Sequence, residues 1–134
     1  MHAGELIVEA NPAAQDVEFL DDRINEFNFA ATELYDGRAL ASFVRDMHGQ
    51  IVAGIYGWTW GGCGYVDKLW VHADMRGQEY GTRLLETFER EAARRGCFQI
   101  LLSTHSFQAP EFYRRHGYSI YGVAEEYPRG YQQY

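Results

Sequence analysis

The sequence has few cysteines, a deficit of positive charge and no long apolar run, and each shortage excludes a class of protein. Its only cysteines are Cys63 and Cys97, and neither lies in a His or Cys cluster with zinc-site spacing. We therefore expect free thiols, with no disulfide framework and no metal site. The formal net charge of −7 leaves no basic face for nucleic acid.

The apolar stretches are also too short for a membrane protein. No run approaches the ~20 apolar residues of a membrane span, and the N-terminus lacks a basic segment followed by an apolar core. We expect a cytoplasmic protein that binds neither nucleic acid nor membrane and whose partners are neutral or cationic. The length is that of one domain with its own core, so residues 1–134 are expected to form a single domain.

The first two thirds of the sequence alternate between strand and helix patterns. Residues 5–10 predict a strand, and Asn11 and Pro12 then predict the start of a helix, because Asn favours the N-cap and Pro the first helical position. Apolar residues at helical spacing continue to Phe27. Three period-two runs around glycine-containing turns, within residues 36–73, predict consecutive antiparallel strands.

From Tyr80 the apolar period changes to that of a helix, with one stripe formed by Leu84, Leu85, Phe88 and Ala92 and with Gly96 as C-cap. A buried strand (97–106), a short helix ending before Gly117 and a last strand (118–127) follow. The unit from 65 to 104 should be a parallel crossover. The order β, α, β, β, β, α, β, α, β indicates an α/β (α+β) fold with a mixed sheet partly covered on both faces.

The loop "RGQEYGT", residues 76–82, stands between a predicted strand and a predicted helix. Unpaired amides and the helix dipole give such a point affinity for phosphate. Gly77 and Gly81 allow close approach of a ligand, Arg76 adds positive charge and Thr82 adds a hydroxyl. The residues alone also fit an ordinary strand-to-helix loop. The Walker and dinucleotide-binding patterns are both absent.

Two segments together resemble the GNAT superfamily of acetyl-CoA-dependent N-acetyltransferases. "LWVHADMRGQEYGTRLL" resembles the family signature of Arg or Gln, two residues, Gly, one residue, then Gly or Ala, and "SFQAPEFYRRHGY" resembles a later short helix with Phe-Tyr. The order of elements agrees over most of the chain. The resemblance implies a mostly antiparallel sheet of six or seven strands with helices on both faces, and parallel strands splayed apart at the cofactor cleft.

The resemblance also implies where acetyl-CoA binds. Its pyrophosphate would lie on the amides of Gly77 to Thr82, and its pantetheine arm would run along the strand near Trp70 as an added strand. The implied cofactor contacts are Leu69, Trp70, Val71, Arg76, Gly77, Gln78, Glu79, Tyr80, Gly81, Thr82, Ser106, Ala109 and Phe112. Ser106 departs from the pattern, because many members have asparagine there.

Glu79 is a second departure, because it replaces the first glycine of the family signature. A carboxylate at ~5 Å from a phosphate costs about 1–3 kcal/mol, depending on the effective dielectric constant. A required positive φ would add about 1 kcal/mol. We therefore expect weakened cofactor binding, and a protein that has lost turnover is the alternative.

Tyr113 matches the tyrosine that, in the family, donates a proton to the departing sulfur; a core tyrosine is the alternative. Asp67 is the preferred base, because strand alternation would put it on one face with Tyr65, Leu69 and Val71, although a bulge would shift this parity. A structural carboxylate is the other interpretation of Asp67. His72, His105 and His116 are weaker candidates.

The acceptor is expected to be a primary amine on a small cationic or neutral molecule, attacking directly in a ternary complex. The resemblance assigns its site to residues 20–36 and 56–62, of which Glu26, Phe29, Tyr35 and Trp58 are the chosen contacts. Acidic and aromatic side chains there would suit a cation, although a solvated helix face over an aromatic core explains them equally well. The short final strand predicts an unprotected edge, which favours a homodimer. A CoA-binding module without turnover and a small-ligand protein without CoA are the alternatives.

Overall fold

A computed structural model describes residues 4–134, which fall into two compact units divided between Tyr35 and Asp36. The first unit contains helix α1 (Ala14–Thr32), in which no side chain is buried. No helix among the described residues is long and apolar enough to cross a membrane.

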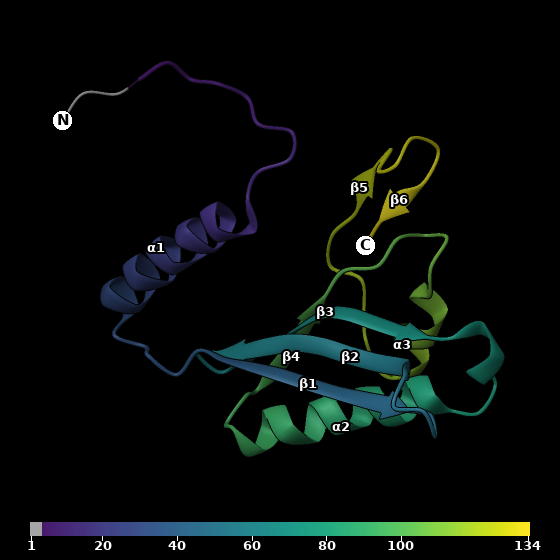
Figure 1. Cartoon of the computed structure of the whole chain (residues 1–134). Helices are drawn as coiled ribbons and strands as arrows, with labels where there is room; N and C mark the ends of the chain where they lie inside the picture. The colour runs from purple at the N-terminus through teal and green to yellow at the C-terminus, as the bar shows by residue number, and fades with distance from the viewer. Residues whose placement is uncertain (1–3) are drawn as a thin grey trace. The chain divides into compact units, whose positions relative to one another are not determined.

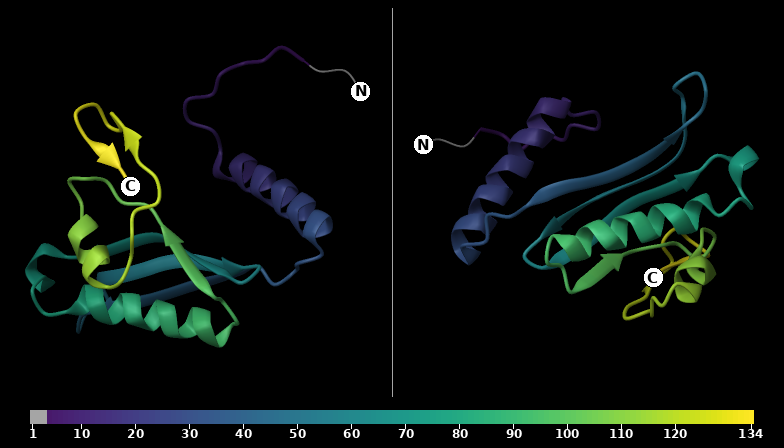
Figure 2. Two further views of the ribbon diagram at one scale, coloured as in Figure 1. Left: turned by 180° about the vertical axis from the view of Figure 1, so that it is seen from behind. Right: turned by 90° about the horizontal axis from the view of Figure 1, so that it is seen from below.

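The second unit is built on a four-stranded sheet in the order β1-β2-β3-β4. Strands β1 (Arg38–Arg45), β2 (Ile51–Trp60) and β3 (Cys63–Val71) are antiparallel neighbours, and β4 (Gln99–Leu102) pairs parallel with β3. Helix α2 (Tyr80–Arg94) connects β3 to β4 and runs along one face of the sheet (Figures 1 and 2). The three antiparallel strands and the parallel crossover predicted from the sequence are thus confirmed.

The remaining elements are short. A 3-10 helix, η1 (Ala73–Met75), follows β3, and helix α3 (Pro110–Arg115) begins with its proline in the first turn. Strands β5 (Ala124–Glu125) and β6 (Gln132–Gln133) form a separate two-stranded sheet. Beside β4, residues 104–106 pair antiparallel with residues 132–134, through reciprocal Thr104–Tyr134 hydrogen bonds of 2.9 and 2.8 Å.

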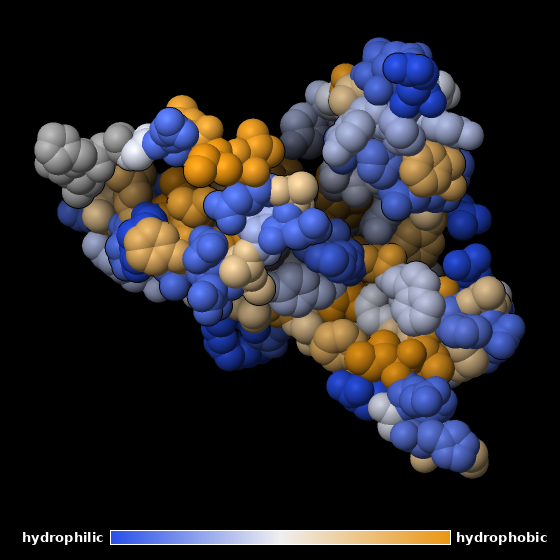
Figure 3. Space-filling view, turned by 45° about the horizontal axis from the view of Figure 1, so that its top comes forward, coloured by the Kyte–Doolittle hydropathy of each residue, from blue (hydrophilic) through white to orange (hydrophobic). Residues whose placement is uncertain are grey.

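Three predictions about secondary structure were wrong. Residues 5–10 form no strand, and the apolar side chains of Leu6, Ile7 and Val8 are exposed. Figure 3 shows apolar residues, in orange, on the surface of the molecule. Helix α1 is capped by Ala13 without a side-chain hydrogen bond, so Asn11 is not its N-cap. The last strand is reduced to β5, so the central sheet has four strands rather than six or seven. Alternation alone does not make a strand, because a strand needs a paired neighbour. Coverage of the second face of the sheet by a helix stays a prediction.

The core lies between α2 and the sheet. The predicted stripe of α2 is buried in full and packs against Leu40, Ala53, Ile55 and Val66. The Phe88 ring lies over two glycines: a Cβ on Gly57 would come 3.1 Å from Phe88 Cε2, and a Cβ on Gly64 would come 3.3 Å from Cε1. Glycine at both positions therefore makes room for the largest side chain of the core.

The C-terminal end of α2 is tied to the sheet by a polar contact. Arg95 Nη1 donates to the carbonyl of Ala39 and to the hydroxyl of Thr59, both at 3.0 Å, while its Nε donates to Glu91 at 2.9 Å. Hydrogen bonds from Arg94 and Arg95 lower the pKa of Glu91 to about 2. Gly96 follows with a positive φ, as expected of a glycine that ends a helix.

We predict that Phe88→Ala lowers the free energy of unfolding by about 3–5 kcal/mol, because it leaves a cavity above Gly57 and Gly64. Chemical denaturation measures this loss. Phe98→Ala is the matched control: Phe98 is 79% exposed, so its truncation should change stability by no more than about 0.5 kcal/mol. Equal effects of the two substitutions would contradict the assignment of Phe88 as the centre of the core.

Candidate active site

The loop from β3 to α2 combines positive φ angles with the open end of a helix. Gly77 has φ +78°, and a Cβ there would meet no atom within 4 Å. Arg76 Nε donates to the carbonyl of Val71 at 3.2 Å, which holds the loop against the end of β3. The first amides of α2 have no partner within the helix and carry its positive dipole end. The loop can therefore hold an anion through backbone amides.

Glu79, which precedes the first residue of α2, has φ 66° and ψ 18°, and its side chain accepts no capping hydrogen bond. This is the left-handed region, which costs a residue with a Cβ about 1 kcal/mol more than glycine. Glu79 thus adopts the positive φ that a glycine would adopt here at lower cost.

Helix α3 docks on the first turn of α2. The Phe112 ring lies over Gly81, where a Cβ would be in ordinary van der Waals contact with Phe112 Cζ at 3.4 Å. One turn further along α3, His116 Nε2 lies 3.0 Å from Thr82 Oγ1. This contact is not predicted from the sequence, because 34 residues separate the pair and no local pattern links them.

The parallel pairing of β3 with β4 ends at Val66 and Leu102, although β3 continues to Val71. Beyond this point β3 has β2 as its one strand partner among the described residues, and the chain after β4 turns instead to the C-terminal segment. The edge of β3 from Asp67 to Val71 is therefore left open on the β4 side, and it leads to the loop before α2. An edge of this kind can accept an extended ligand through backbone hydrogen bonds.

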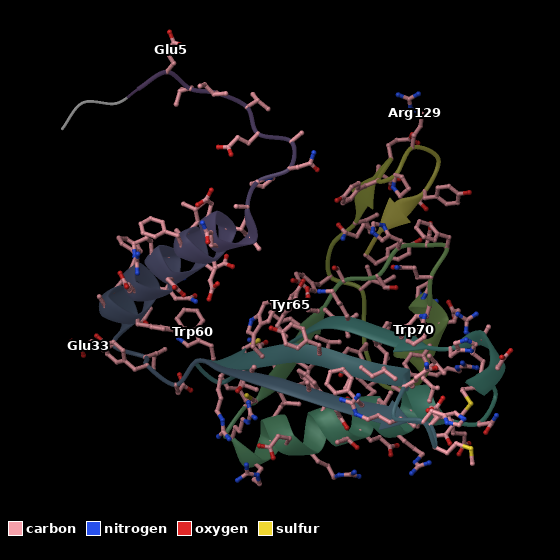
Figure 4. All side chains as sticks on the ribbon, in the orientation of Figure 1. Glu5, Glu33, Trp60, Tyr65, Trp70 and Arg129 are labelled. Atoms are coloured by element: carbon pink, nitrogen blue, oxygen red, sulfur yellow. The ribbon has the colours of Figure 1, made fainter. Side chains whose placement is uncertain are left out.

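A β-bulge places Asp67 differently from the expectation. Gly57 pairs with Val66 and Tyr56 with Lys68, so Asp67 is the extra residue. Leu69 and Val71 pack against the core, whereas Tyr65 stacks on Trp58 with ring centroids 5.0 Å apart. Tyr65 points away from α2 (Figure 4). The prediction that Tyr65, Leu69 and Val71 share one face was wrong, because the bulge inverts the alternation. The Asp67 carboxylate forms an ion pair with Lys68.

Tyr113 lies at a cavity of about 550 Å³ whose lining includes Leu101, Leu102, Thr104 and Tyr118. Burial raises the pKa of Tyr113, which favours its protonated form. The neighbouring Tyr118 hydroxyl donates to Glu89 at 2.8 Å. Burial is the main cause that raises the pKa of Tyr118, and this hydrogen bond raises it further. Asp67 directly follows Val66, the residue that pairs with Leu102, so it stands where β3 and β4 separate, while Tyr113 and Leu102 line the same cavity.

Other predicted site residues are dispersed. The Ser106 hydroxyl accepts a hydrogen bond from the Gln132 amide at 3.1 Å, and Ala109 is the N-cap of α3. Trp70 is 49% exposed and Gln78 is also exposed, whereas Tyr80 packs against the core. Glu26, ion-paired with Arg23, lies in the first unit, as do Phe29 and Tyr35, while Trp58 lies in the second.

Known proteins are similar to this chain in sequence and architecture. The family model "Acetyltransferase (GNAT) domain" matches residues 38–120. Blasticidin-S acetyltransferase of Streptomyces morookaense is 36% identical to this chain over 94 residues, which cover 67% of each chain. IAA acetyltransferase of Azospirillum brasilense is 39% identical over 66 residues, which cover 48% of this chain and 43% of that one. A solved acetyltransferase from Bacillus cereus ATCC 14579, 32% identical, has a TM-score of 0.77 and covers 95% of this chain and 93% of its own.

Replacing Glu79 separates its two effects. Glu79→Gly removes the strained φ and the charge, so it should stabilise the fold by about 1 kcal/mol and tighten CoA binding about tenfold. Glu79→Gln removes the charge and keeps the strain, so it should tighten binding without gain in stability. Thermal unfolding and calorimetric titration with CoA measure the two quantities. Unchanged CoA affinity in both variants would mean that the side chain does not sense the phosphates.

Proposed function

The chain belongs to the GNAT family of acetyltransferases, whose acetyl donor is acetyl-CoA, and on this premise we propose that it acetylates a primary amine of a small cationic or neutral molecule. The amine would attack the acetyl group directly in a ternary complex. One observation carries the proposal: β3 loses its β4 partner at Val66 and Leu102 and continues to Val71, after which the chain leads to the open amides at the N-terminus of α2. An extended, phosphorylated acyl donor would thus find suitable groups for both of its halves.

The residues of the loop and strand edge fit CoA. The amides of Gly77 to Thr82 would hold the pyrophosphate. The β3 edge at Leu69, Trp70 and Val71 would hold the pantetheine arm, and Phe112 and Ala109 would pack beside it. Glu79 opposes this fit through its charge without occupying the amides, since it makes no capping bond. When bound, acetyl-CoA supplies a thioester as the acetyl donor.

Tyr113 would be the general acid in this reaction. Its phenol is kept protonated by burial and lies at the cavity beside β4. A phenol with a pKa of about 10 or above can still protonate an alkyl thiolate, because proton transfer within the reacting complex is driven as the sulfur gains charge. The backbone amides near Trp70 and Val71 would polarise the carbonyl as the tetrahedral centre forms.

Asp67 would be the general base, directly or through one water. The bulge frees its backbone from ladder pairing and puts its carboxylate next to the point of strand separation. The carboxylate is also ion-paired with the Lys68 ammonium.

The acceptor class is drawn from the named relatives and from charge. Two of them are named for small molecules, blasticidin-S and IAA. The net charge of −7 favours neutral or cationic acceptors. Trp58, on β2, would contact the acceptor.

Two features favour a second candidate function, a CoA-binding module with weak or lost turnover. Glu79 strains the phosphate loop, and the Ser106 hydroxyl is engaged by Gln132. Calorimetric titration of acetyl-CoA, run beside a free-thiol release assay over polyamines, aminoglycosides, amino acids and basic peptides, decides between the two. Binding with thiol release supports the transferase, binding without release from any amine supports the module, and no binding contradicts both.

Homodimerisation is part of the proposal. Over residues 99–102 the edge of β4 that faces away from β3 has no strand partner within residues 4–134. A free strand edge of this kind favours pairing with another copy of the chain.

Tyr113→Phe should lower kcat about 100-fold or more with little change in CoA affinity, because only the ionisable hydroxyl is lost. Steady-state thiol release and calorimetry measure the two effects. Tyr118→Phe is the matched control, since it removes a neighbouring hydroxyl that is engaged by Glu89. Turnover of Tyr113→Phe equal to that of the unmodified enzyme would refute the acid role.

Asp67→Asn should lower kcat/KM about 100-fold or more near neutral pH, and the deficit should shrink as the pH approaches the pKa of the acceptor amine. The amine then loses its proton to solvent and no longer needs the carboxylate. Asp74→Asn, at an exposed residue of η1, is the control. A deficit that is the same at every pH would indicate a structural carboxylate instead.

A further inference from the structure

The contact between Thr82 and His116 joins the anion-binding loop to α3. Thr82 Oγ1 and His116 Nε2 are 3.0 Å apart, and both side chains are half-buried. The imidazole also packs on the Phe112 ring, with centroids 4.7 Å apart, and Phe112 in turn lies against Gly81. The position of the imidazole is therefore fixed by aromatic packing, and its hydrogen bond within the described residues goes to a hydroxyl of the first turn of α2.

Neighbouring charged groups have other partners. Glu111 pairs with Arg114, Glu89 accepts from Tyr118, and Arg83 lies over the Tyr80 ring. Among the described residues, none of these groups forms a hydrogen bond or ion pair with the imidazole or with Thr82. The hydrogen-bond partner of the Thr82 hydroxyl there is His116.

A threonine hydroxyl has a single proton to donate. If His116 Nε2 accepts a hydrogen bond from the Thr82 hydroxyl, that hydroxyl cannot also donate to an anion at the loop. If Nε2 carries a hydrogen, the imidazole donates to Oγ1, and the hydroxyl proton is free to point at the loop. Such a chain of donors strengthens each of its hydrogen bonds.

We propose that His116 is a positioning residue that orients the Thr82 hydroxyl as a donor to the pyrophosphate of acetyl-CoA. The proposal rests on the proposed function, since it needs a pyrophosphate on the amides of Gly77 to Thr82. An anion there selects the form of His116 with a hydrogen on Nε2. The residue thereby acts on cofactor affinity through Thr82 and touches neither the acetyl group nor the acceptor.

The test compares three replacements of His116 in the full chain. His116→Leu removes the partner and should weaken CoA binding about tenfold, the range of one hydrogen bond to a charged group. His116→Gln can still donate to Thr82 and should bind within about twofold of the unmodified chain. His116→Glu accepts the Thr82 proton and should lose as much as His116→Leu or more. His48→Leu, in the exposed β1–β2 turn, is the matched histidine control.

Two further readouts separate positioning from general structural support. In a Thr82→Val background, His116→Leu should weaken CoA binding no further, because the hydroxyl is already absent. In steady-state assays His116→Leu should raise KM for acetyl-CoA and leave kcat at saturation near its original value. The same loss should occur with 3′-dephospho-CoA, which retains the pyrophosphate.

Several outcomes would overturn the inference. The first two are unchanged CoA affinity in His116→Leu and equal CoA affinities of His116→Gln and His116→Glu. The third is an undiminished loss of CoA affinity when His116→Leu is made in the Thr82→Val background. The fourth is a loss of affinity for CoA but not for 3′-dephospho-CoA, which would place His116 at the 3′-phosphate. If the unmodified chain binds no CoA, the proposed function itself fails. If it binds CoA and His116→Leu binds equally well, only the role of His116 fails.

Discussion

The position of α2 on the sheet depends on one packing constraint, the Phe88 ring above Gly57 and Gly64. A Cβ on Gly57 would also come 1.8 Å from the carbonyl oxygen of Tyr65, so β2 and β3 approach each other too closely there for any side chain. The same place holds the bulge that displaces Asp67 from the ladder. Core packing and the placement of the candidate base are therefore consequences of one close backbone approach.

With α2 fixed in this way, the first turn of the helix lies where β3 ends, and the loop between them has little freedom. Gly77, Glu79 and the Arg76–Val71 contact complete the connection. Since β4 leaves β3 at Leu102 to pair its continuation with the C-terminal residues, the strand edge and the open helix end occur together. The site thus arises from the connectivity of the sheet, and the catalytic candidates Tyr113 and Asp67 are carried on elements that border it.

Regular periodicity made much of this unit predictable. The stripe of α2, the Gly96 ending and the hairpins follow from local rules, because each depends on residues within a few positions. The bulge at Asp67 depends on a cross-strand approach at Gly57, and the Thr82–His116 pair depends on how two helices dock, so neither is encoded locally. The strand predicted at residues 5–10 failed for the same reason, since alternation indicates an available face but not a partner. The two-motif resemblance succeeded because it joined segments that local rules treat separately.

The strain at Glu79 shows why a departure from a signature is not by itself a loss of the site. A glycine in a phosphate loop serves two purposes, a positive φ and room for the ligand. Glu79 attains the φ at a cost of about 1 kcal/mol, which a packed domain can bear when Phe88 and the α3 contacts hold α2 in place. Its carboxylate makes no capping hydrogen bond, so it does not occupy the N–H groups of the first turn of α2. What the glutamate changes is the charge beside the amides, because its carboxylate would repel a bound phosphate.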